Sequence, residues 1–415
     1  MQSIKELLEA ISRVQTYVLR RVAAKLRDGK TLNVYFFVSQ KQFWSMQSVY
    51  DALAAYDCFR LYIVPFPTSF HTHGERKRNY ADLCEFHEKK GATIVRVCDC
   101  AGNLLIQPEE LEADLVLYEQ HWMINYHPSY TLWEMCVMAL CVCMPYGIMI
   151  ANIPEDQFNE NAHNLAWRNF AETPMHLKLS RKYAANKGVN TVVSGYPKLD
   201  AYARPVEKNY WKTDSPRIKR IVWAPHYSIR TDDAINCSTF HMYWMQFMEL
   251  VKNSGDKLEM VLKPHPALKS RCLKVGFPEE IFDRYMSEWD SLPNASVVTD
   301  GDYVDLFTTS DALILDSLSF ISEYLVTGKP MCFLSKFPDF SKLSGIFNDY
   351  GKMVISLVDV AYNFNDAATF INNVCKGTAG VSSEREYFTD SMLKVNFGHV
   401  GEFIANHILE QLRAV

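Results

Sequence analysis

Two segments in the C-terminal half of the chain each combine a short apolar run with polar residues at its end. Met260–Pro266 reads MVLKPHP and holds His265 between two prolines. Ser310–Pro330 places Ser317 and Ser319 where a predicted strand gives way to a predicted helix. Ligands of open α/β sheets bind at the carboxyl ends of the strands, and the free N–H groups at a helix start favour anions. A histidine and a serine pair at such positions suit a reaction on a phosphate group.

The residues around these two positions extend the same chemistry. Lys263 adds a positive charge, while a neutral His265 can accept a proton and a protonated His265 can stabilise a phosphate oxygen. Glu323 lies four residues past Ser319, on the same helix face, and can accept hydrogen bonds from ribose hydroxyls. The alternative is a plain helix cap formed by Ser319 and Glu323. A cap does not account for both serines and the rigid TGKP exit, so we favour an anion site.

A third predicted strand end, in the segment WAPHYSIR, supplies further polar groups. His226 and Ser228 follow the predicted strand 218–223, and Arg230 can reach a phosphate bound there. An ordinary loop histidine is the alternative for His226. The chain has no GxxxxGK[ST] loop and no convincing GxGxxG after its first strand. Phosphate must therefore be held by side chains and a helix start rather than by a glycine-rich loop.

The N-terminal half offers two candidates for a general base. The polar segment Glu119–Tyr130 follows a predicted strand and contains His121 and His127. Either imidazole can deprotonate an acceptor hydroxyl, and a structural role is the alternative for each. His163 falls in a predicted helix over 161–170, where we expect it on the surface.

Metal-binding signals in the sequence are weak. His71 and His73 have no evident third ligand, and Asp300-Gly301-Asp302 is only a three-residue match to the DxD pattern of some transferases. A turn that begins the following helix is the better interpretation of the latter. We predict no metal site, and no cofactor is required by the sequence.

The elements that must position these residues alternate between strands and helices. The predicted strands cover 32–38, 61–65, 92–97, 114–118, 190–193, 218–223, 258–262, 296–299, 312–315 and 330–334. Predicted helices between them include 43–55, 83–90, 240–253, 303–309 and 320–327. Such alternation indicates doubly wound, mainly parallel α/β sheets. The polar segment Tyr202–Arg217 is the predicted linker between two domains.

Composition limits the class of protein. At 415 residues the chain suits two domains, and 48% hydrophobic with 22% charged residues is typical of a soluble globular protein. A net charge of −5 gives no basic field for nucleic acid. The 11 cysteines are odd in number and many lie in apolar runs, which indicates reduced thiols in the cytoplasm. No secretory signal is visible.

Two apolar segments raise the question of a membrane. Met135–Ile153 is interrupted by Pro145 and Gly147, so we expect a buried helix, a turn and a strand rather than a membrane span. Residues 1–28 form an amphipathic helical pattern with a basic face. Such a helix can lie on an anionic membrane surface or pack on the core with its basic face in water, and we favour the second interpretation.

Several segments together resemble the CDP-glycerol glycerophosphotransferase family, enzymes that build teichoic-acid-like polymers and capsular or lipopolysaccharide polyol phosphates. They are SGYPKLD (194–200), WAPHYSI (223–229), LKPHP (262–266), GDYVDLF (301–307) and SDALILDSLSFISEYLVTGKP (310–330), in family order. The resemblance implies a glycosyltransferase-B fold of two Rossmann-like domains facing a cleft. We expect an acceptor domain over 1–205, a CDP-donor domain over 206–393 and a closing helix over 394–415.

The resemblance also implies roles for residues. His265 and the motif containing Ser317, Ser319 and Glu323 correspond to groups that engage the donor diphosphate and nucleotide. Teichoic acid polymerases carry a WHGTP-like motif whose histidine is the proposed base, whereas this chain has Pro145-Tyr146-Gly147 near that position. The identity of the base therefore stays open between His121 and His127.

The expected reaction is transfer of glycerol phosphate or ribitol phosphate from CDP-glycerol or CDP-ribitol to an oligosaccharide or lipid-linked acceptor, with release of CMP. Two alternatives stay open: a glycosyltransferase-B enzyme that uses a nucleotide sugar, and a non-catalytic subunit that binds polysaccharide or nucleotide. We expect a cytoplasmic protein with a peripheral contact on the inner face of the cell membrane.

Overall fold

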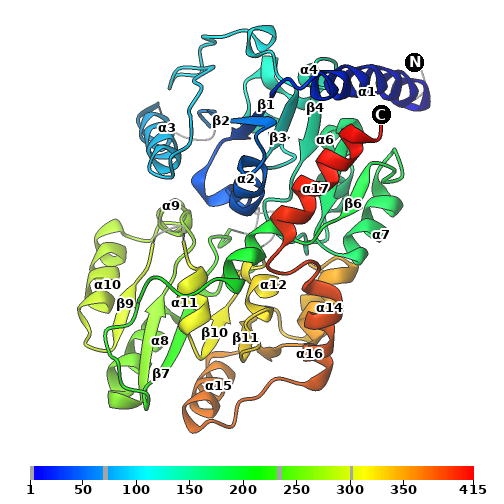
Figure 1. Cartoon of the computed structure of the whole chain (residues 1–415). Helices are drawn as coiled ribbons and strands as arrows, with labels where there is room; N and C mark the ends of the chain where they lie inside the picture. The colour runs from blue at the N-terminus through cyan, green and yellow to red at the C-terminus, as the bar shows by residue number, and fades with distance from the viewer. Residues whose placement is uncertain (1–3, 69–72, 231–235, 300–301) are drawn as a thin grey trace. The chain divides into compact units, whose positions relative to one another are not determined.

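The computed structural model describes residues 4–68, 73–230, 236–299 and 302–415. The chain forms two compact units, each built around a six-stranded parallel sheet with helices on its faces (Figure 1). Unit 1 comprises Met1–Met149, Ile153–Ala203 and Lys394–Val415, and unit 2 comprises Ile150–Asn152 and Arg204–Leu393. The α/β fold class predicted from the alternating pattern is confirmed.

The sheet of unit 1 has the strand order β2-β1-β3-β4-β5-β6. Its strands are β1 (Leu32–Val38), β2 (Phe59–Pro65), β3 (Leu115–Tyr118), β4 (Leu140–Cys143), β5 (Arg168–Ala171) and β6 (Thr191–Val193). The strands are apolar because both faces are covered, and Phe36 and Phe37 of β1 are fully buried on opposite faces. The order reverses between β1 and β3, where ligands bind in sheets of this type.

The helices of unit 1 include both the first and the last helix of the chain. They are α1 (Ile4–Arg27), α2 (Gln47–Ala54), α3 (His73–Glu88), α4 (Leu132–Met135), α5 (Pro154–Phe158), α6 (Asn161–Leu165), α7 (Pro174–Tyr183) and α17 (Val400–Arg413). The last of these lies alongside α2 (Figure 1). A Cβ atom on Gly401 of α17 would lie 2.3 Å from backbone atoms of Ser48 in α2, so only glycine allows this approach.

The segment SGYPKLD ties the C-terminal helix to unit 1. Gly195 has a φ of +91°, and a Cβ atom there would lie 2.2 Å from the carbonyl oxygen of Val395. The carboxylate of Asp200 accepts hydrogen bonds from the backbone N–H groups of Val400 and Gly401, at 3.0 and 2.9 Å. It thereby satisfies N–H groups that have no partner within the helix. In this chain the motif is a structural clamp on α17.

The sheet of unit 2 has the strand order β12-β11-β10-β7-β8-β9. Its strands are β7 (Lys219–Ala224), β8 (Leu258–Leu262), β9 (Ala295–Val297), β10 (Ala312–Leu315), β11 (Met331–Leu334) and β12 (Asp359–Ala361). Its helices are α8 (Phe240–Asn253), α9 (Leu268–Lys274), α10 (Glu279–Ser291), α11 (Val304–Thr309), α12 (Ser319–Leu325), α13 (Phe340–Ser344), α14 (Asp349–Ser356), α15 (Phe364–Lys376) and α16 (Ser383–Phe388). This is the Rossmann order, with its switch point between β7 and β10.

Three of the predicted elements are wrong. The strand expected over 92–97 is reduced to an isolated bridge between Ile63 and Ile94. The helix expected over 161–170 ends at Leu165. Its last three residues belong to β5 instead, because they pair with both β4 and β6. In the segment Met135–Ile153 the strand, β4, precedes the turn instead of following it. Local periodicity is ambiguous for short apolar runs, and tertiary pairing decides them.

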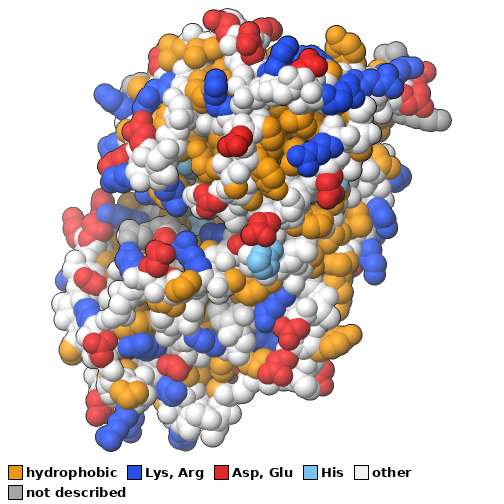
Figure 2. Space-filling model, viewed as in Figure 1, with side chains coloured by type: hydrophobic (Ala, Val, Ile, Leu, Met, Phe, Trp, Pro, Cys, Tyr) orange, Lys and Arg blue, Asp and Glu red, His pale blue; other side chains and the backbone are white. Residues whose placement is uncertain are grey.

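Helix α1 packs on the core of unit 1 through one face. Val18 and Val22 are buried, whereas Arg13, Arg20 and Arg21 are exposed. In the space-filling view, Lys and Arg side chains gather over α1 (Figure 2). Among the described residues, no helix has the length and apolar character needed to cross a membrane.

Candidate active site

Three neighbouring strands of unit 2 bring the predicted donor residues to one edge of its sheet. β7 pairs directly with β8 on one side and with β10 on the other. His226 follows β7, His265 follows β8 and Ser317 follows β10, so all three leave carboxyl ends of adjacent strands. The β7–β10 pair is also the switch point of the sheet. Residues about 90 positions apart in sequence therefore meet where a Rossmann-like sheet binds its ligand.

Asp316, which directly follows β10, holds this edge together. Its side chain is fully buried. Oδ1 accepts a hydrogen bond from the backbone N–H of His226, and Oδ2 accepts from the backbone N–H and the hydroxyl of Thr239, the residue that precedes α8. Burial raises the pKa of Asp316 to about 6, and the hydrogen bonds it accepts oppose that rise. The carboxylate thus fixes the loop after β7 and the start of α8 to the end of β10.

Hydrogen bonds settle the tautomer of His226. The hydroxyl of Ser228 accepts from the backbone N–H of Cys237 at 3.1 Å and lies 2.7 Å from Nδ1 of His226. Nδ1 also accepts from the backbone N–H of Ser228, at 3.4 Å. Nδ1 is therefore the unprotonated nitrogen, and Nε2 carries the hydrogen. Burial, followed by the nearby His265, lowers the pKa of His226 well below its ordinary value, so the ring is neutral.

His265 has the same tautomer. Its Nδ1 accepts a hydrogen bond from the backbone N–H of Ala267 at 3.1 Å, which leaves the hydrogen on Nε2. Burial and then the charge of Lys263 lower its pKa to about 4. The ring centres of His226 and His265 are 5.2 Å apart. The edge therefore presents two neutral imidazoles whose Nε2–H groups can donate to an anion.

Lys263 and Glu323 both interact with Tyr303, an aromatic residue that the sequence did not single out. The ammonium of Lys263 is 5.6 Å from the ring centre of Tyr303, and the side chain is buried. The hydroxyl of Tyr303 donates to Oε2 of Glu323 at 2.6 Å. Glu323 is buried as well. Its carboxylate is thus oriented by Tyr303 rather than directed freely to solvent.

The remaining predicted donor residues occupy different environments. Ser317 is buried, whereas Ser319 is exposed as the first residue of α12. The N-cap of α12 is Leu318, which makes no side-chain cap, so the structure does not place Ser319 as the cap. Arg230 lines a groove of about 750 Å³ together with His241 and the segment 275–278.

In unit 1, His121 and His127 lie in unlike surroundings. His127 is half-buried, and its Nδ1 accepts from the backbone N–H of Ser129 as the N-cap of a single 3₁₀ turn. His121 is buried with its ring centre 4.7 Å from that of His163 and 6.0 Å from that of Tyr146. Burial, followed by the neighbouring His163, lowers the pKa of His121 well below its ordinary value.

The expectation of a surface position for His163 is wrong. The side chain is partly buried, and burial lowers its pKa to about 4. Its Nδ1 accepts from the backbone N–H of Glu160 at 3.1 Å, which leaves Nε2 protonated. The reason for the error is the packing of its ring against that of His121, a contact between distant residues that a helical pattern does not indicate.

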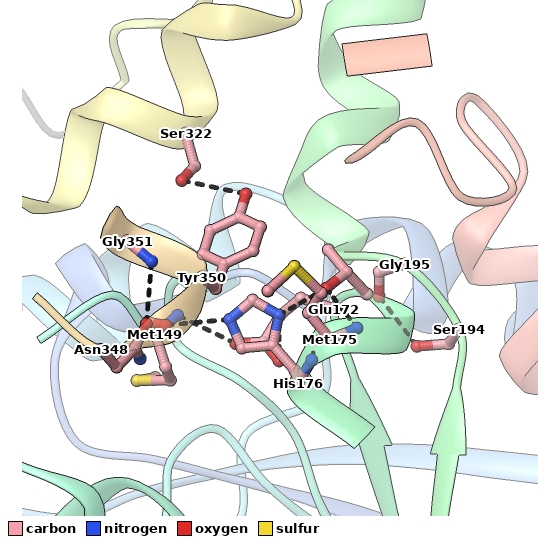
Figure 3. A network of polar contacts seen from close by, with 11 residues as sticks. Met149, Glu172, Met175, His176, Ser194, Gly195, Ser322, Asn348, Tyr350 and Gly351 are labelled. Carbon is pink, nitrogen blue, oxygen red and sulfur yellow. Dashed lines mark hydrogen bonds and ion pairs between the residues drawn. The ribbon is translucent and has the colours of Figure 1, made fainter. Parts of the chain in front are cut away.

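His121 and His163 line a cavity of about 50 Å³ at the carboxyl ends of β3, β4 and β5. His176 of α7 lies on the same cavity and is drawn beside Met149 and Glu172 in Figure 3. Its Nε2 lies 2.9 Å from the carbonyl oxygen of Met149, and its Nδ1 lies 2.8 Å from the hydroxyl of Thr173. A carbonyl only accepts, so Nε2 carries the hydrogen.

A second buried carboxyl group stands at the switch point of unit 1. Glu119 follows β3, and its Oε1 accepts from the backbone N–H and hydroxyl of Ser39, after β1, and from the backbone N–H of Gln40. Burial raises the pKa of Glu119 to about 8. Each unit therefore has a buried acid that fixes the loop after its first strand.

The weak metal signals find no support in the described residues. His71 and the pair Asp300-Gly301 lie outside the described ranges. Within those ranges, no group of three or more His, Cys, Asp or Glu side chains is arranged to hold a metal ion.

Sequence reasoning missed Asp316, Tyr303, His163 and Glu119. Asp316 and Glu119 share a signal, since each is the first acidic residue after an apolar strand. Tyr303 and His163 had no such signal, because their contacts are with residues distant in sequence, Glu323 and His121.

Comparison with known proteins agrees with the fold. The family described as CDP-glycerol:poly(glycerophosphate) glycerophosphotransferase matches residues 150–410. No curated protein sequence matches significantly. Similar solved structures include the wall teichoic acid polymerase TagF, at 14% identity, covering 100% of this chain and 99% of that chain with a TM-score of 0.61. They also include S. aureus MnaA with UDP, at 15% identity, covering 93% of this chain and 98% of that chain with a TM-score of 0.55.

A UDP-GlcNAc 2-epimerase from Neisseria meningitidis is also similar, at 12% identity, covering 91% of this chain and all of that chain with a TM-score of 0.53. At these identities the likeness shows the fold, which is the glycosyltransferase-B fold expected from the sequence. The family match is more specific and covers more than half of the chain, including every strand of unit 2. The protein therefore belongs to the CDP-glycerol:poly(glycerophosphate) glycerophosphotransferase family, whose enzymes transfer glycerol phosphate from CDP-glycerol.

Proposed function

We propose that the diphosphate of CDP-glycerol binds at the carboxyl ends of β7, β8 and β10 in unit 2. The observation that carries this proposal is the pair of neutral imidazoles, His226 and His265, with Nε2 protonated in both. Two such donors can bind a diphosphate without any rearrangement of their hydrogen bonds to the protein. Lys263, Ser317 and Ser319 add a charge and two hydroxyl donors. Arg230, Ser228 and Glu323 complete the predicted set of donor-binding residues.

The proposed reaction is an in-line displacement at the β-phosphorus of the donor. The acceptor oxygen forms a new bond to that phosphorus, the bond from phosphorus to the bridging oxygen breaks, and CMP leaves with the electron pair. The acceptor proton goes to a base. His226 and His265 donate to phosphate oxygens as their charge grows, and the bound anion raises the pKa of both rings. In this role His265 acts as a hydrogen-bond donor rather than as the base.

We infer that His121, rather than His127, is the base. His121 lines a cavity at the ligand edge of the unit 1 sheet, next to Tyr146 of the PYG turn. His127 is engaged as a cap and has no place on that cavity among its described lining residues. A buried neutral imidazole can accept a proton at the moment of attack, when the developing phosphate charge favours its protonated form. Unit 1 is accordingly the acceptor unit in this proposal.

The acceptor is proposed to be a hydroxyl of a surface polysaccharide or a lipid-linked chain. TagF, which shares the fold, is a wall teichoic acid polymerase, and one of its structures comes from a crystal soaked with CDPG. Glycerol phosphate is the favoured unit because the family is defined by it, and ribitol phosphate is the alternative.

A peripheral membrane contact would bring the protein to such an acceptor. The exposed face of α1 carries Arg13, Arg20 and Arg21, and Tyr17 among them is 70% exposed. Basic residues with an exposed aromatic ring suit the surface of an anionic bilayer. Sedimentation with vesicles of phosphatidylglycerol, compared with phosphatidylcholine, tests this contact. Equal sedimentation with both would contradict it.

The function is tested by a donor screen with nucleotide products identified by mass. We expect CMP from CDP-glycerol in the presence of a glycerol phosphate oligomer, and elongation of that oligomer by one glycerol phosphate. Release of UDP from a UDP-sugar instead would identify a sugar transferase. Binding of CDP-glycerol with no release of CMP would identify a non-catalytic subunit. Either of these results overturns the proposal.

A further inference from the structure

Three partly exposed aromatic residues of unit 1, which we call the edge cluster, meet at the ligand edge of its sheet. Phe43 lies in the loop after β1, Trp122 in the loop after β3 and Tyr146 in the turn after β4. The ring centre of Tyr146 is 5.2 Å from that of Phe43 and 4.8 Å from that of Trp122. Because β1, β3 and β4 are neighbours in the sheet, residues distant in sequence gather where such sheets bind their ligands.

Packing of the core does not account for the edge cluster. None of its three residues belongs to the two core clusters described for unit 1, and each keeps part of its surface exposed. Trp44, next to Phe43 in the chain, is buried and does belong to that core. Apolar side chains that gather at one exposed place mark a binding site, whereas single exposed ones do not.

The charges around the edge cluster argue against a ligand rich in phosphate. The loops after β1, β3 and β4 contribute the described residues 39–46, 119–131 and 144–149 of unit 1. In these ranges the only Lys or Arg is Lys41, and the only acid is Glu119, which is buried. A chain of glycerol phosphates carries a negative charge on every unit and would meet no matching row of basic groups here.

The polar side chains that precede Phe43 are neutral amides. Gln40 is partly exposed and Gln42 is exposed. An amide group both donates and accepts, so it matches hydroxyl groups, which also do both. The negative faces of aromatic rings attract C–H groups, which carry a partial positive charge. Aromatic rings beside neutral amides therefore suit a sugar ring, which offers a face of C–H groups and an edge of hydroxyls.

The inclination of the rings distinguishes a sugar from a nucleobase. The ring plane of Tyr146 is inclined by 43° to that of Trp122 and by 61° to that of Phe43. The planes of Phe43 and Trp122 are inclined by 57°. A flat base stacks face to face on an aromatic ring, and these three rings form no slot with parallel walls. A sugar ring is puckered and can contact rings at different inclinations.

We propose that the edge cluster binds a neutral sugar ring of the acceptor. His121, the proposed base, lies beside it, with its ring centre 4.7 Å from that of Trp122 and 6.0 Å from that of Tyr146. A sugar bound on the cluster brings the reacting end of the acceptor toward this imidazole. The inference rests on the proposed function, which gives unit 1 the acceptor. It adds the chemical class of the group that unit 1 recognises and three residues outside the predicted site.

Trp122→Ala offers the sharpest test, because the side chain of Trp122 makes no cap hydrogen bond to the 3₁₀ turn that follows it. The probes are the methyl glycosides of glucose, galactose and N-acetylglucosamine, without any donor. NMR measures the transfer of saturation from aromatic protons of the protein to each probe. We expect transfer to the C–H protons on one face of at least one glycoside. Trp122→Ala should bind that glycoside about tenfold more weakly, and Trp122→Phe should recover most of the binding because it restores a ring.

Trp133→Ala is the matched control, since Trp133 is a 46% exposed tryptophan of α4 in the same unit. It should bind the glycoside like the wild type. The inference is overturned if the wild type binds none of the glycosides, if Trp122→Ala binds as well as the wild type, or if Trp133→Ala weakens binding equally. Displacement of the glycoside by an equal concentration of a glycerol phosphate trimer or of CMP would also overturn it, because the site would then take a phosphate-bearing ligand.

CMP release from CDP-glycerol is measured in parallel to separate the two proposals. Sugar binding that depends on Trp122, with no release of CMP, would contradict the proposed function and leave the sugar site standing. Normal CMP release with no sugar binding that depends on Trp122 would contradict the sugar site alone.

Discussion

The carboxylate of Asp316, at the end of β10, accepts a hydrogen bond from the backbone N–H of His226, 90 residues earlier at the end of β7. Because the same carboxylate also accepts from Thr239, one buried acid sets the position of the imidazole relative to the loop and helix around it. In the proposed donor site Asp316 is a positioning residue, because it contacts His226 and would act on the donor through it.

Asp316→Asn should weaken the binding of CDP-glycerol. The accompanying loss of stability should not be large enough to account for that effect. The asparagine side chain keeps one acceptor oxygen, but its NH2 group takes the place of the other carboxylate oxygen. That NH2 group then faces a backbone N–H group that has lost its acceptor, so His226 shifts. We expect a loss of about 1–3 kcal/mol in the free energy of unfolding and a rise of about tenfold in the KM for CDP-glycerol. Asp311→Asn is the control, because Asp311 accepts from the backbone N–H of Arg220 at the opposite end of the same strand pair. A similar rise in KM for both variants would contradict a positioning role.

Substitutions of His265 should distinguish a hydrogen-bond donor from a base. The amide nitrogen of glutamine reaches about as far as Nε2, whereas that of asparagine reaches only the place of Nδ1. Because the hydrogen of His265 lies on Nε2, His265→Gln should keep a measurable share of kcat while His265→Asn and His265→Ala lose about a hundredfold. Steady-state CMP release measures all three. A glutamine variant as inactive as the alanine variant would favour proton transfer by His265.

Because of the buried carboxyl group of Glu119, the free energy of unfolding should decrease as pH rises from about 5 to about 8. Its pKa rises from 4.5 to about 8 in the folded protein, so the folded state retains this proton to a higher pH than the unfolded chain does. The stability it contributes is complete below the ordinary pKa and is lost as pH rises toward about 8, at up to about 1.4 kcal/mol per pH unit.

Glu119→Gln keeps an acceptor for Ser39 and cannot ionise, so it should lose less free energy of unfolding than the wild type between pH 5 and pH 8. Chemical denaturation at the two pH values measures the difference. Parallel pH dependence in the two proteins would show that Glu119 is ionised in the fold at neutral pH.

The contact between α17 and α2 should tolerate no side chain at Gly401. Alanine normally favours a helix over glycine by about 1 kcal/mol, yet a Cβ atom here meets the backbone of Ser48. We expect Gly401→Ala to lower the free energy of unfolding by about 1–3 kcal/mol. Gly74→Ala, in the first turn of α3, meets only the far end of Arg78 at 4.0 Å and should be neutral or stabilising. Equal thermal stability of the two variants would contradict the close approach.

Much of the fold could be predicted because its strands are buried on both faces. Mainly apolar runs such as Leu258–Leu262 and Leu32–Val38 predicted β8 and β1 with the bounds that the structure has. β5 escaped prediction because Arg168 and Asn169 interrupt its apolar character, and only its pairing with β4 and β6 makes it a strand. The sequence reveals the hydrophobic period of a helix or strand, but it does not reveal the strands with which that segment pairs.

The meeting of the candidate residues at one sheet edge could be predicted as far as strand ends determine it. His265, His226 and Ser317 were identified because each follows an apolar run, and parallel strands bring such residues to one edge. The contacts of Asp316 with His226 and of His163 with His121 join residues distant in sequence. No local pattern contains that information. The tautomers that make His226 and His265 donors likewise depend on backbone N–H groups whose positions only the folded loops define.

A crystal structure of the protein with CDP-glycerol tests the proposed position of the donor diphosphate most directly. We predict diphosphate oxygens within hydrogen-bonding distance of Nε2 of both His226 and His265, beside the end of β10. A diphosphate bound elsewhere in unit 2, or in unit 1, with both imidazoles directed away from it, would contradict the proposed donor site.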